Sequence, residues 1–119
     1  MSQIASFYLI KNNQRQKLSN GNCSADVYMA IWDYCESELD IDVRFPAPQT
    51  EETLDCALME GKLASDLLEA LREQDLLELA AEIAPDWDLT VEAVQSRLET
   101  LYSHLKLVWD DTALLYEMT

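Results

Sequence analysis

The order of apolar and polar residues along the chain predicts a mixture of strands and helices. Residues 4–10 are mainly apolar and contain the aromatic pair Phe7 and Tyr8, which indicates a buried strand. Residues 40–45 alternate strictly between polar and apolar side chains, which is the period of a half-buried strand. Residues 11–24 are polar and contain turn-forming residues, so we expect them to form a mobile loop.

Helical spacing of apolar residues marks three further parts of the chain. A first helix is expected over residues 25–39, with Ser24 as its N-cap. A longer helical region is expected from Thr50 to about residue 84. The leucine stripe changes phase at residues 74–75, where a capping sequence follows, so this region is expected to break into two helices. Another helix is expected from about Leu89 onward.

Residues 105–118 allow two interpretations. They can form a hairpin with strands at 105–109 and 113–118, or they can extend the preceding helix. We favour the hairpin because two aspartates followed by Thr112 are typical of a turn. The strand at 4–10 also needs partners beyond the short segment at 40–45, because it is apolar on both faces.

These elements together predict an α+β fold. Its small, mostly antiparallel sheet is built from the N-terminal strand, the 40–45 segment and the C-terminal hairpin, and about four helices cover it. The alternative is a mostly α fold with a long C-terminal helix. With 119 residues, the chain is long enough for one core, so we expect a single acidic globular domain over residues 1–119.

Composition bears on the location of the protein. The first residues lack a basic leader, and no stretch approaches the roughly 20 apolar residues of a membrane-spanning helix. The three cysteines are odd in number and widely spaced, which argues against a secreted disulfide framework and for buried thiols. We therefore expect a cytoplasmic protein.

Charge is the strongest signal in the sequence. The chain has 23 acidic and 8 basic residues, for a net charge of −15. Residues 1–25 contain three basic residues and no acid, so the acidic residues are confined to the rest of the chain. Such a body repels nucleic acid and anionic membranes and attracts basic protein surfaces. We therefore expect no nucleic-acid or membrane partner.

No residue pattern indicates catalysis, a cofactor or a metal. The only histidine is His104, which is expected at the end of the last helix, where the helix dipole favours its charged form. One histidine and three scattered cysteines do not form a zinc site. The pairs Asp40/Asp42 and Asp86/Asp88 lack the pattern of a calcium-binding loop. An enzyme is therefore not expected, and no catalytic, cofactor-binding or metal-binding residue is predicted.

The acidic helical region is the best candidate for a binding surface. Residues 51–84 hold ten acidic and two basic residues, and several like charges stand three to five positions apart. A tryptophan between two aspartates, at 86–88, suits either an aromatic anchor with a charged rim or a ring that fixes the turn to the core. The candidate partner-binding residues are Trp87, Asp86, Asp88, Trp32, Tyr34, Asp66, Glu69, Glu73, Glu78 and Glu82.

Two functional hypotheses of different classes follow from size and charge. The first is an acidic protein-binding module, such as an immunity or inhibitor protein that neutralises a basic partner, for example a toxin. The second is a small acidic secretion or folding chaperone that acts as a homodimer and holds an apolar segment of its client. Acidity can also serve solubility alone.

Overall fold

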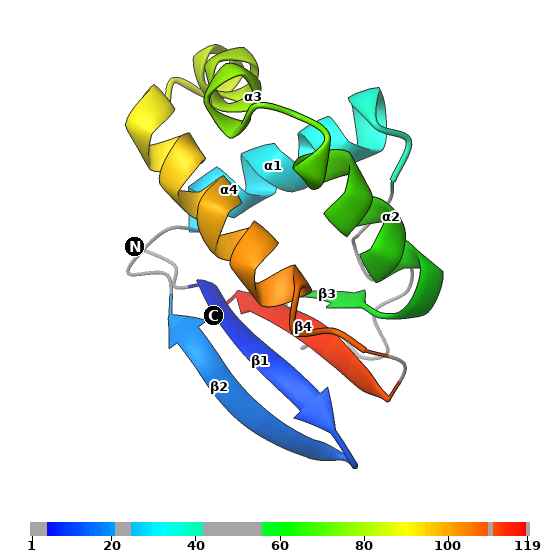
Figure 1. Ribbon diagram of the computed structural model, residues 1–119. Helices are drawn as coiled ribbons and strands as arrows, with labels where there is room; N and C mark the ends of the chain where they lie inside the picture. Colours follow the sequence, from blue (N-terminus) through cyan, green and yellow to red (C-terminus); the bar gives the residue numbers. More distant parts are fainter. Residues whose placement is uncertain (1–4, 21–24, 42–55, 110, 119) are drawn as a thin grey trace.

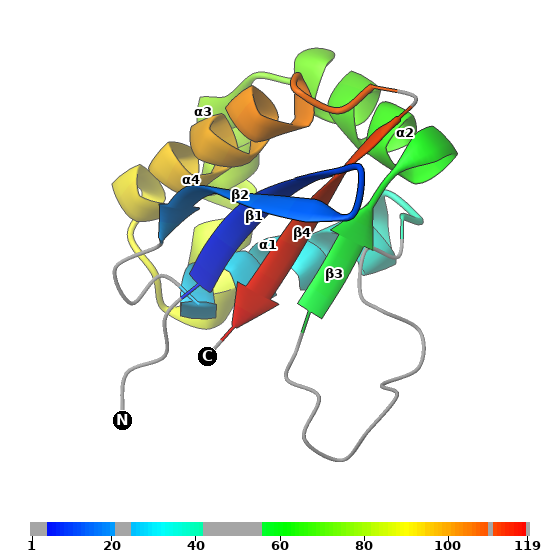
Figure 2. The same cartoon turned by 90° about the horizontal axis from the view of Figure 1, so that it is seen from below.

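The computed structural model describes residues 5–20, 25–41, 56–109 and 111–118, which form a four-stranded antiparallel sheet with four α-helices on one side of it (Figure 1). The strand order is β2-β1-β4-β3. In Figure 2 the same sheet is seen from below, with helix α1 (Ala25–Glu38) behind it. The predicted α+β class is therefore confirmed.

The two ends of the chain supply the central strands of the sheet. Strands β1 (Ala5–Lys11) and β4 (Thr112–Met118) pair antiparallel, with Ala5 opposite Met118 and Lys11 opposite Thr112. Each central strand has a neighbour on both edges, which suits their apolar composition. The prediction that both chain ends build the sheet is confirmed.

The polar segment after β1 is a strand, and the predicted loop over 11–24 is wrong in this part. Strand β2 (Gln14–Asn20) returns along the outer edge of β1. The two turn residues, Asn12 and Asn13, have φ angles of 54° and 63°. Positive φ at both positions gives a two-residue hairpin turn whose twist matches that of the flanking strands. An edge strand can be polar, so its sequence carries little hydrophobic signal.

A second correction concerns the residues before the second helix. Strand β3 (Cys56–Met59) lies at the other edge of the sheet and pairs with β4, although the apolar stripe predicted a helix there. Gly61, with a φ of 57°, follows the strand and begins α2 (Gly61–Arg72). The predicted helix start at Thr50 lies outside the described residues.

Two predicted strands also need correction. The first is the strand predicted at 40–45. Asp40 has a left-handed φ of 57°, and the Ile41 amide donates to the Cys35 carbonyl oxygen at 2.8 Å. Together these features form a motif that ends α1, so residues 40–41 are not in a strand. Positions 42–45 of that predicted strand lie outside the described residues. The first arm of the C-terminal hairpin, 105–109, is the end of a helix and a turn, whereas the second arm forms β4. The alternative of a continuous C-terminal helix is wrong, because the helix stops at Leu105.

Apart from the later start of α2, the helices follow the predicted pattern. They are α1 (Ala25–Glu38), α2, α3 (Leu76–Ile83) and α4 (Val91–Leu105), with a short 3₁₀ turn, η1 (Ala84–Trp87), between the last two. The break at 74–75 is confirmed, because Asp75 caps α3 by accepting a hydrogen bond from the Leu77 amide at 2.9 Å. Thr90 caps α4 in the same way, through the Ala93 amide. The predicted cap of the first helix, Ser24, lies outside the described residues.

An aromatic cluster fills the space between the sheet and the helices. Phe7 and Tyr116 of the sheet pack against Tyr28 and Trp32 of α1, with ring centroids 5.0 to 5.9 Å apart. All four side chains are at most 2% exposed. Helix α4 contacts the other three helices. Helix α3 packs against α4 and α1 and lies farther from the sheet (Figure 1).

Candidate protein-binding site

Helices α1 and α3 and the turn η1 enclose an open hollow of about 360 Å³, which we call the α1–α3 hollow. Four of the ten residues predicted for partner binding meet here, from parts of the chain about fifty residues apart. The described residues that line it are Ala30, Asp33, Tyr34, Ser37, Glu38, Glu82, Ile83, Asp86 and Trp87.

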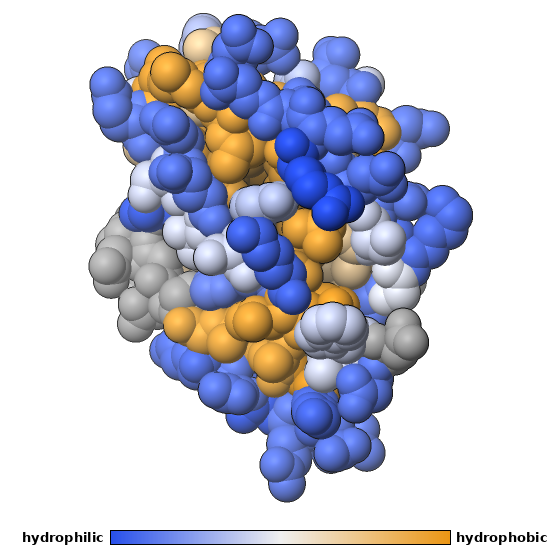
Figure 3. All heavy atoms as spheres, in the orientation of Figure 1, coloured by the Kyte–Doolittle hydropathy of each residue, from blue (hydrophilic) through white to orange (hydrophobic). Residues whose placement is uncertain are grey.

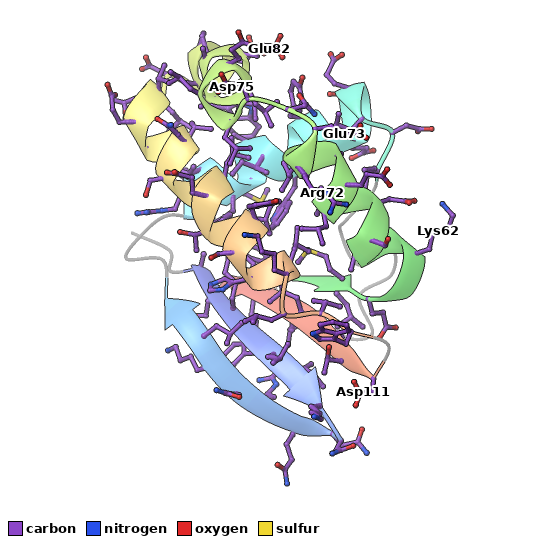
Figure 4. All side chains as sticks on the ribbon, viewed as in Figure 1. Lys62, Arg72, Glu73, Asp75, Glu82 and Asp111 are labelled. Atoms are coloured by element: carbon purple, nitrogen blue, oxygen red, sulfur yellow. The ribbon has the colours of Figure 1, made fainter. Side chains whose placement is uncertain are left out.

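Helical geometry explains why these residues share one surface. On α1 the lining residues stand three, four, seven and eight positions after Ala30, which places them on one face of the helix. Glu82 and Asp86 are likewise four positions apart, across the end of α3. Figure 4 shows Glu82 at the end of the molecule farthest from the sheet. The site therefore belongs to the helical layer.

A hydrogen bond joins the two walls of the hollow. The Tyr34 hydroxyl donates to Glu82 Oε2 at 2.7 Å. Burial, this hydrogen bond and the negative charge of Glu82 and then Glu38 raise the pKa of Tyr34 to about 12. Tyr34 is therefore neutral at physiological pH and holds the Glu82 carboxylate in place, while the second oxygen of that carboxylate can accept from a ligand.

The hollow is electrically one-sided. Asp33, Glu38, Glu82 and Asp86 contribute four carboxyl groups, and no Lys or Arg is among the described residues that line it. The side chain of Trp87 is 41% exposed and adds an aromatic surface beside these carboxylates. An aromatic ring next to carboxylates favours a cation and disfavours an anion.

The turn that carries Trp87 is well defined. Asp88 has left-handed angles, φ 54° and ψ 42°, and its amide donates to the Pro85 carbonyl oxygen at 3.3 Å. The Leu89 amide donates to the Ala84 carbonyl oxygen at 3.0 Å. The predicted stop and turn after α3 is therefore confirmed, and it holds the Trp87 backbone in a fixed position.

The other predicted residues lie elsewhere. Trp32 is only 2% exposed and packs in the aromatic cluster, so its ring is not available to a partner surface. Asp66 pairs with Lys62 on α2 at 2.7 Å. The remaining predicted acids are exposed outside the lining of the hollow; they are Glu69, Glu73, Glu78 and Asp88.

Sequence reasoning missed two of the acids in the hollow. Asp33 and Glu38 of α1 are not among the predicted residues, because the prediction rested on the density of acids in residues 51–84. Their signal was present, since they stand one position before and four positions after Tyr34, a predicted anchor. A helical projection centred on Tyr34 would have found both.

Metal, membrane and thiol chemistry can be compared with the described residues in turn. Within the described ranges, no three His, Cys, Asp or Glu side chains converge to hold a metal ion, and no helix is long and apolar enough to cross a membrane. His104 lies in the last turn of α4, as expected, but burial lowers its pKa, which opposes the effect of the helix dipole on its charged form. Burial raises the pKa of the Cys35 thiol to about 12, which makes it a poor nucleophile.

Comparison with protein-family models, with curated proteins and with solved structures finds no match to this chain. Function must therefore be argued from the chemistry of the α1–α3 hollow and from the charge of the protein.

Proposed function

We propose that this protein binds a basic protein partner and that the α1–α3 hollow receives an arginine or lysine side chain of that partner. The observation that carries the proposal is the meeting of a half-exposed tryptophan with four carboxyl groups in one hollow, with no Lys or Arg among its described lining residues. Within this function, we place the protein among immunity or inhibitor proteins that neutralise a basic enzyme, because its net charge is −15.

Two interactions of different kinds would act on the bound cation. The face or edge of Trp87 offers a cation–π contact, which contributes about 0.5 to 2 kcal/mol depending on how far the cation is desolvated. The carboxylate of Glu82, held by Tyr34 at 2.7 Å, offers a charge-assisted hydrogen bond. Since Glu82 is already oriented, little side-chain entropy is lost on binding.

The net charge of the protein would act at longer range. An acidic body accelerates its encounter with a basic surface by electrostatic steering, and this acceleration falls as the salt concentration rises. Affinity would then depend on both a general term, from all the acids, and a local term, from the hollow. The experiment must separate the two.

The test begins with the tagged protein on a resin, a lysate of the source cells at low salt, and elution by a salt step. The captured protein is then purified and its affinity for variants is measured by calorimetry. Trp87→Ala should weaken binding about 30-fold, the equivalent of about 2 kcal/mol for an aromatic anchor.

A matched pair of variants separates local from general charge. Glu82→Gln and Glu78→Gln remove the same charge from the same helix, but only Glu82 lines the hollow. Glu82→Gln should weaken binding about tenfold, whereas Glu78→Gln should change it less than about threefold. Equal effects of the two variants, or full affinity in Trp87→Ala, would refute the assignment of the hollow.

A further inference from the structure

A second hollow lies on another side of the molecule, between the start of α2 and the turn that joins α4 to β4. Its volume is about 460 Å³, and we call it the Trp109 groove. None of its described lining residues also lines the α1–α3 hollow. The described residues that line it are Gly61, Lys62, Ala64, Ser65, Leu68, Leu105, Val108 and Trp109.

The side of the molecule beside this groove exposes much apolar surface. Trp109 is 73% exposed, the highest exposure among the large hydrophobic residues in the described ranges, and its neighbour Leu107 is 42% exposed. In Figure 3, apolar side chains gather over β1 next to the C-terminal end of α4, and a further apolar area lies toward α3. An exposed tryptophan beside an apolar groove is the arrangement found at the centre of protein interfaces.

The backbone around Trp109 is fixed by Thr112. The Trp109 amide donates to Thr112 Oγ1 at 2.6 Å, and the Thr112 amide donates back to the Trp109 carbonyl oxygen at 3.1 Å. The backbone of Trp109 is therefore tied to the start of β4, so little backbone entropy would be lost at Trp109 on binding.

Charge distinguishes this groove from the rest of the protein. The chain carries a net charge of −15, yet the described residues that line the groove include no acid. They include Lys62, whose side chain is 87% exposed and pairs with Asp66 at 2.7 Å. Nothing in this lining favours a basic partner. It is instead a place where a second acidic molecule can approach with little repulsion.

We propose that the Trp109 groove is the contact surface of a homodimer, with Trp109 of each copy inserted into the groove of the other. Such a twofold interface is self-complementary, and this surface supplies both the inserted side chain and the groove that receives it. Asp111 is exposed two residues after Trp109, and Figure 4 shows Asp111 and Lys62 on the same side of the molecule. In the dimer, Asp111 of one copy approaches Lys62 of the other. The Lys62 ammonium group donates one hydrogen bond to Asp66 and has further N–H donors that Asp111 can use.

This dimer is independent of the proposed binding of a basic partner, and salt should affect the two in opposite directions. Salt screens the repulsion between two copies of charge −15, so dimerisation should strengthen as salt rises. Binding to a basic partner should weaken under the same conditions. Trp87→Ala should leave dimerisation unchanged, because Trp87 is not in the Trp109 groove.

Analytical ultracentrifugation over a range of protein concentrations tests the proposal. The unmodified chain should dimerise, and Trp109→Ala should raise the dimer dissociation constant about tenfold or more. Leu77→Ala is the matched control, because Leu77 is also an exposed hydrophobic residue, at 50%, but lies on α3 outside the groove. Thermal melts of both variants establish that each remains folded.

A charge exchange tests the arrangement of the two copies. Lys62→Glu should weaken the dimer, and the double variant Lys62→Glu with Asp111→Lys should recover most of the loss. A chain that stays monomeric at every concentration, a dimer that Trp109→Ala leaves intact, or an exchange without recovery would overturn the proposal. Loss of the captured basic partner in Trp109→Ala, with no dimer in the unmodified chain, would assign the groove to that partner and also overturn it.

Discussion

Trp32 gives a sharp test of the packing between sheet and helices. Its ring lies 5.9 Å from Tyr28 in a stacked arrangement and 5.2 Å from Tyr116 in an edge arrangement. The side chain is 2% exposed, but its indole N–H has no hydrogen-bond partner among the described residues. The same side chain therefore contributes a large apolar ring and an unsatisfied polar group, whose effects on stability have opposite signs.

Two substitutions separate these effects. Trp32→Ala leaves a large cavity and should lower the free energy of unfolding by about 3 to 5 kcal/mol. With a urea dependence of about 1.5 kcal/mol per molar, that loss moves the midpoint of urea denaturation down by about 2 to 3 M.

Trp32→Phe keeps an aromatic ring and removes the N–H. The smaller ring leaves a residual cavity that costs on the order of 1 kcal/mol. Removal of the unpartnered donor returns about 1 to 3 kcal/mol. The net change is therefore between about zero and a gain of about 2 kcal/mol, so Trp32→Phe should be at least as stable as the unmodified chain.

Urea denaturation followed by circular dichroism at 222 nm measures both variants without relying on tryptophan fluorescence. Trp109→Phe, measured at a protein concentration low enough to keep the chain monomeric, is the control, since Trp109 is 73% exposed and the same change there should shift the stability of the monomer by less than about 0.5 kcal/mol. If Trp32→Phe cost as much as Trp32→Ala, the reasoning from the unpartnered N–H would be refuted.

Two further predictions concern a helix cap and the single histidine. Asp75→Ala should lower the free energy of unfolding by about 1 kcal/mol in urea denaturation, because the Leu77 amide loses its acceptor. Asp75→Asn keeps a capping oxygen and should retain most of the stability. Equal losses in the two variants would contradict the role of Asp75 as a cap. Burial holds the pKa of His104 below 6.5, so the unfolded chain binds a proton at this side chain more readily than the folded chain does. The stability that depends on a neutral His104 is therefore present above pH 6.5 and is lost as the pH falls through the lowered pKa. An NMR titration of the imidazole should give a midpoint below 6.5, and a midpoint at or above that value would contradict the burial.

The helices could be predicted well because their signals are local. In α4 the apolar stripe at Val94, Leu98, Leu101 and Leu105 is fully buried, as the helical period requires. The phase change at 74–75 and the cap at Asp75 also depend only on neighbouring residues. Such features are visible in a single sequence.

The edge strands could not be predicted in this way. Strand β2 is polar because it lies at the edge, and β3 continues an apolar stripe that also suits a helix. Whether such a segment becomes a strand depends on the partner beside it, which the rest of the fold supplies. The pairing of β4 with β1 and β3, instead of with 105–109, has the same origin.

The candidate site divides along the same line. The sequence by itself determined the charge of −15, the aromatic residues near the acids and the turn that carries Trp87. It did not determine that Trp32 faces the core while Tyr34, two positions later on the same helix, faces the hollow. Nor did it bring Tyr34 to Glu82, 48 residues away. Charge and helical period belong to the chain alone, whereas a hollow between two helices exists only once tertiary packing fixes their faces relative to each other.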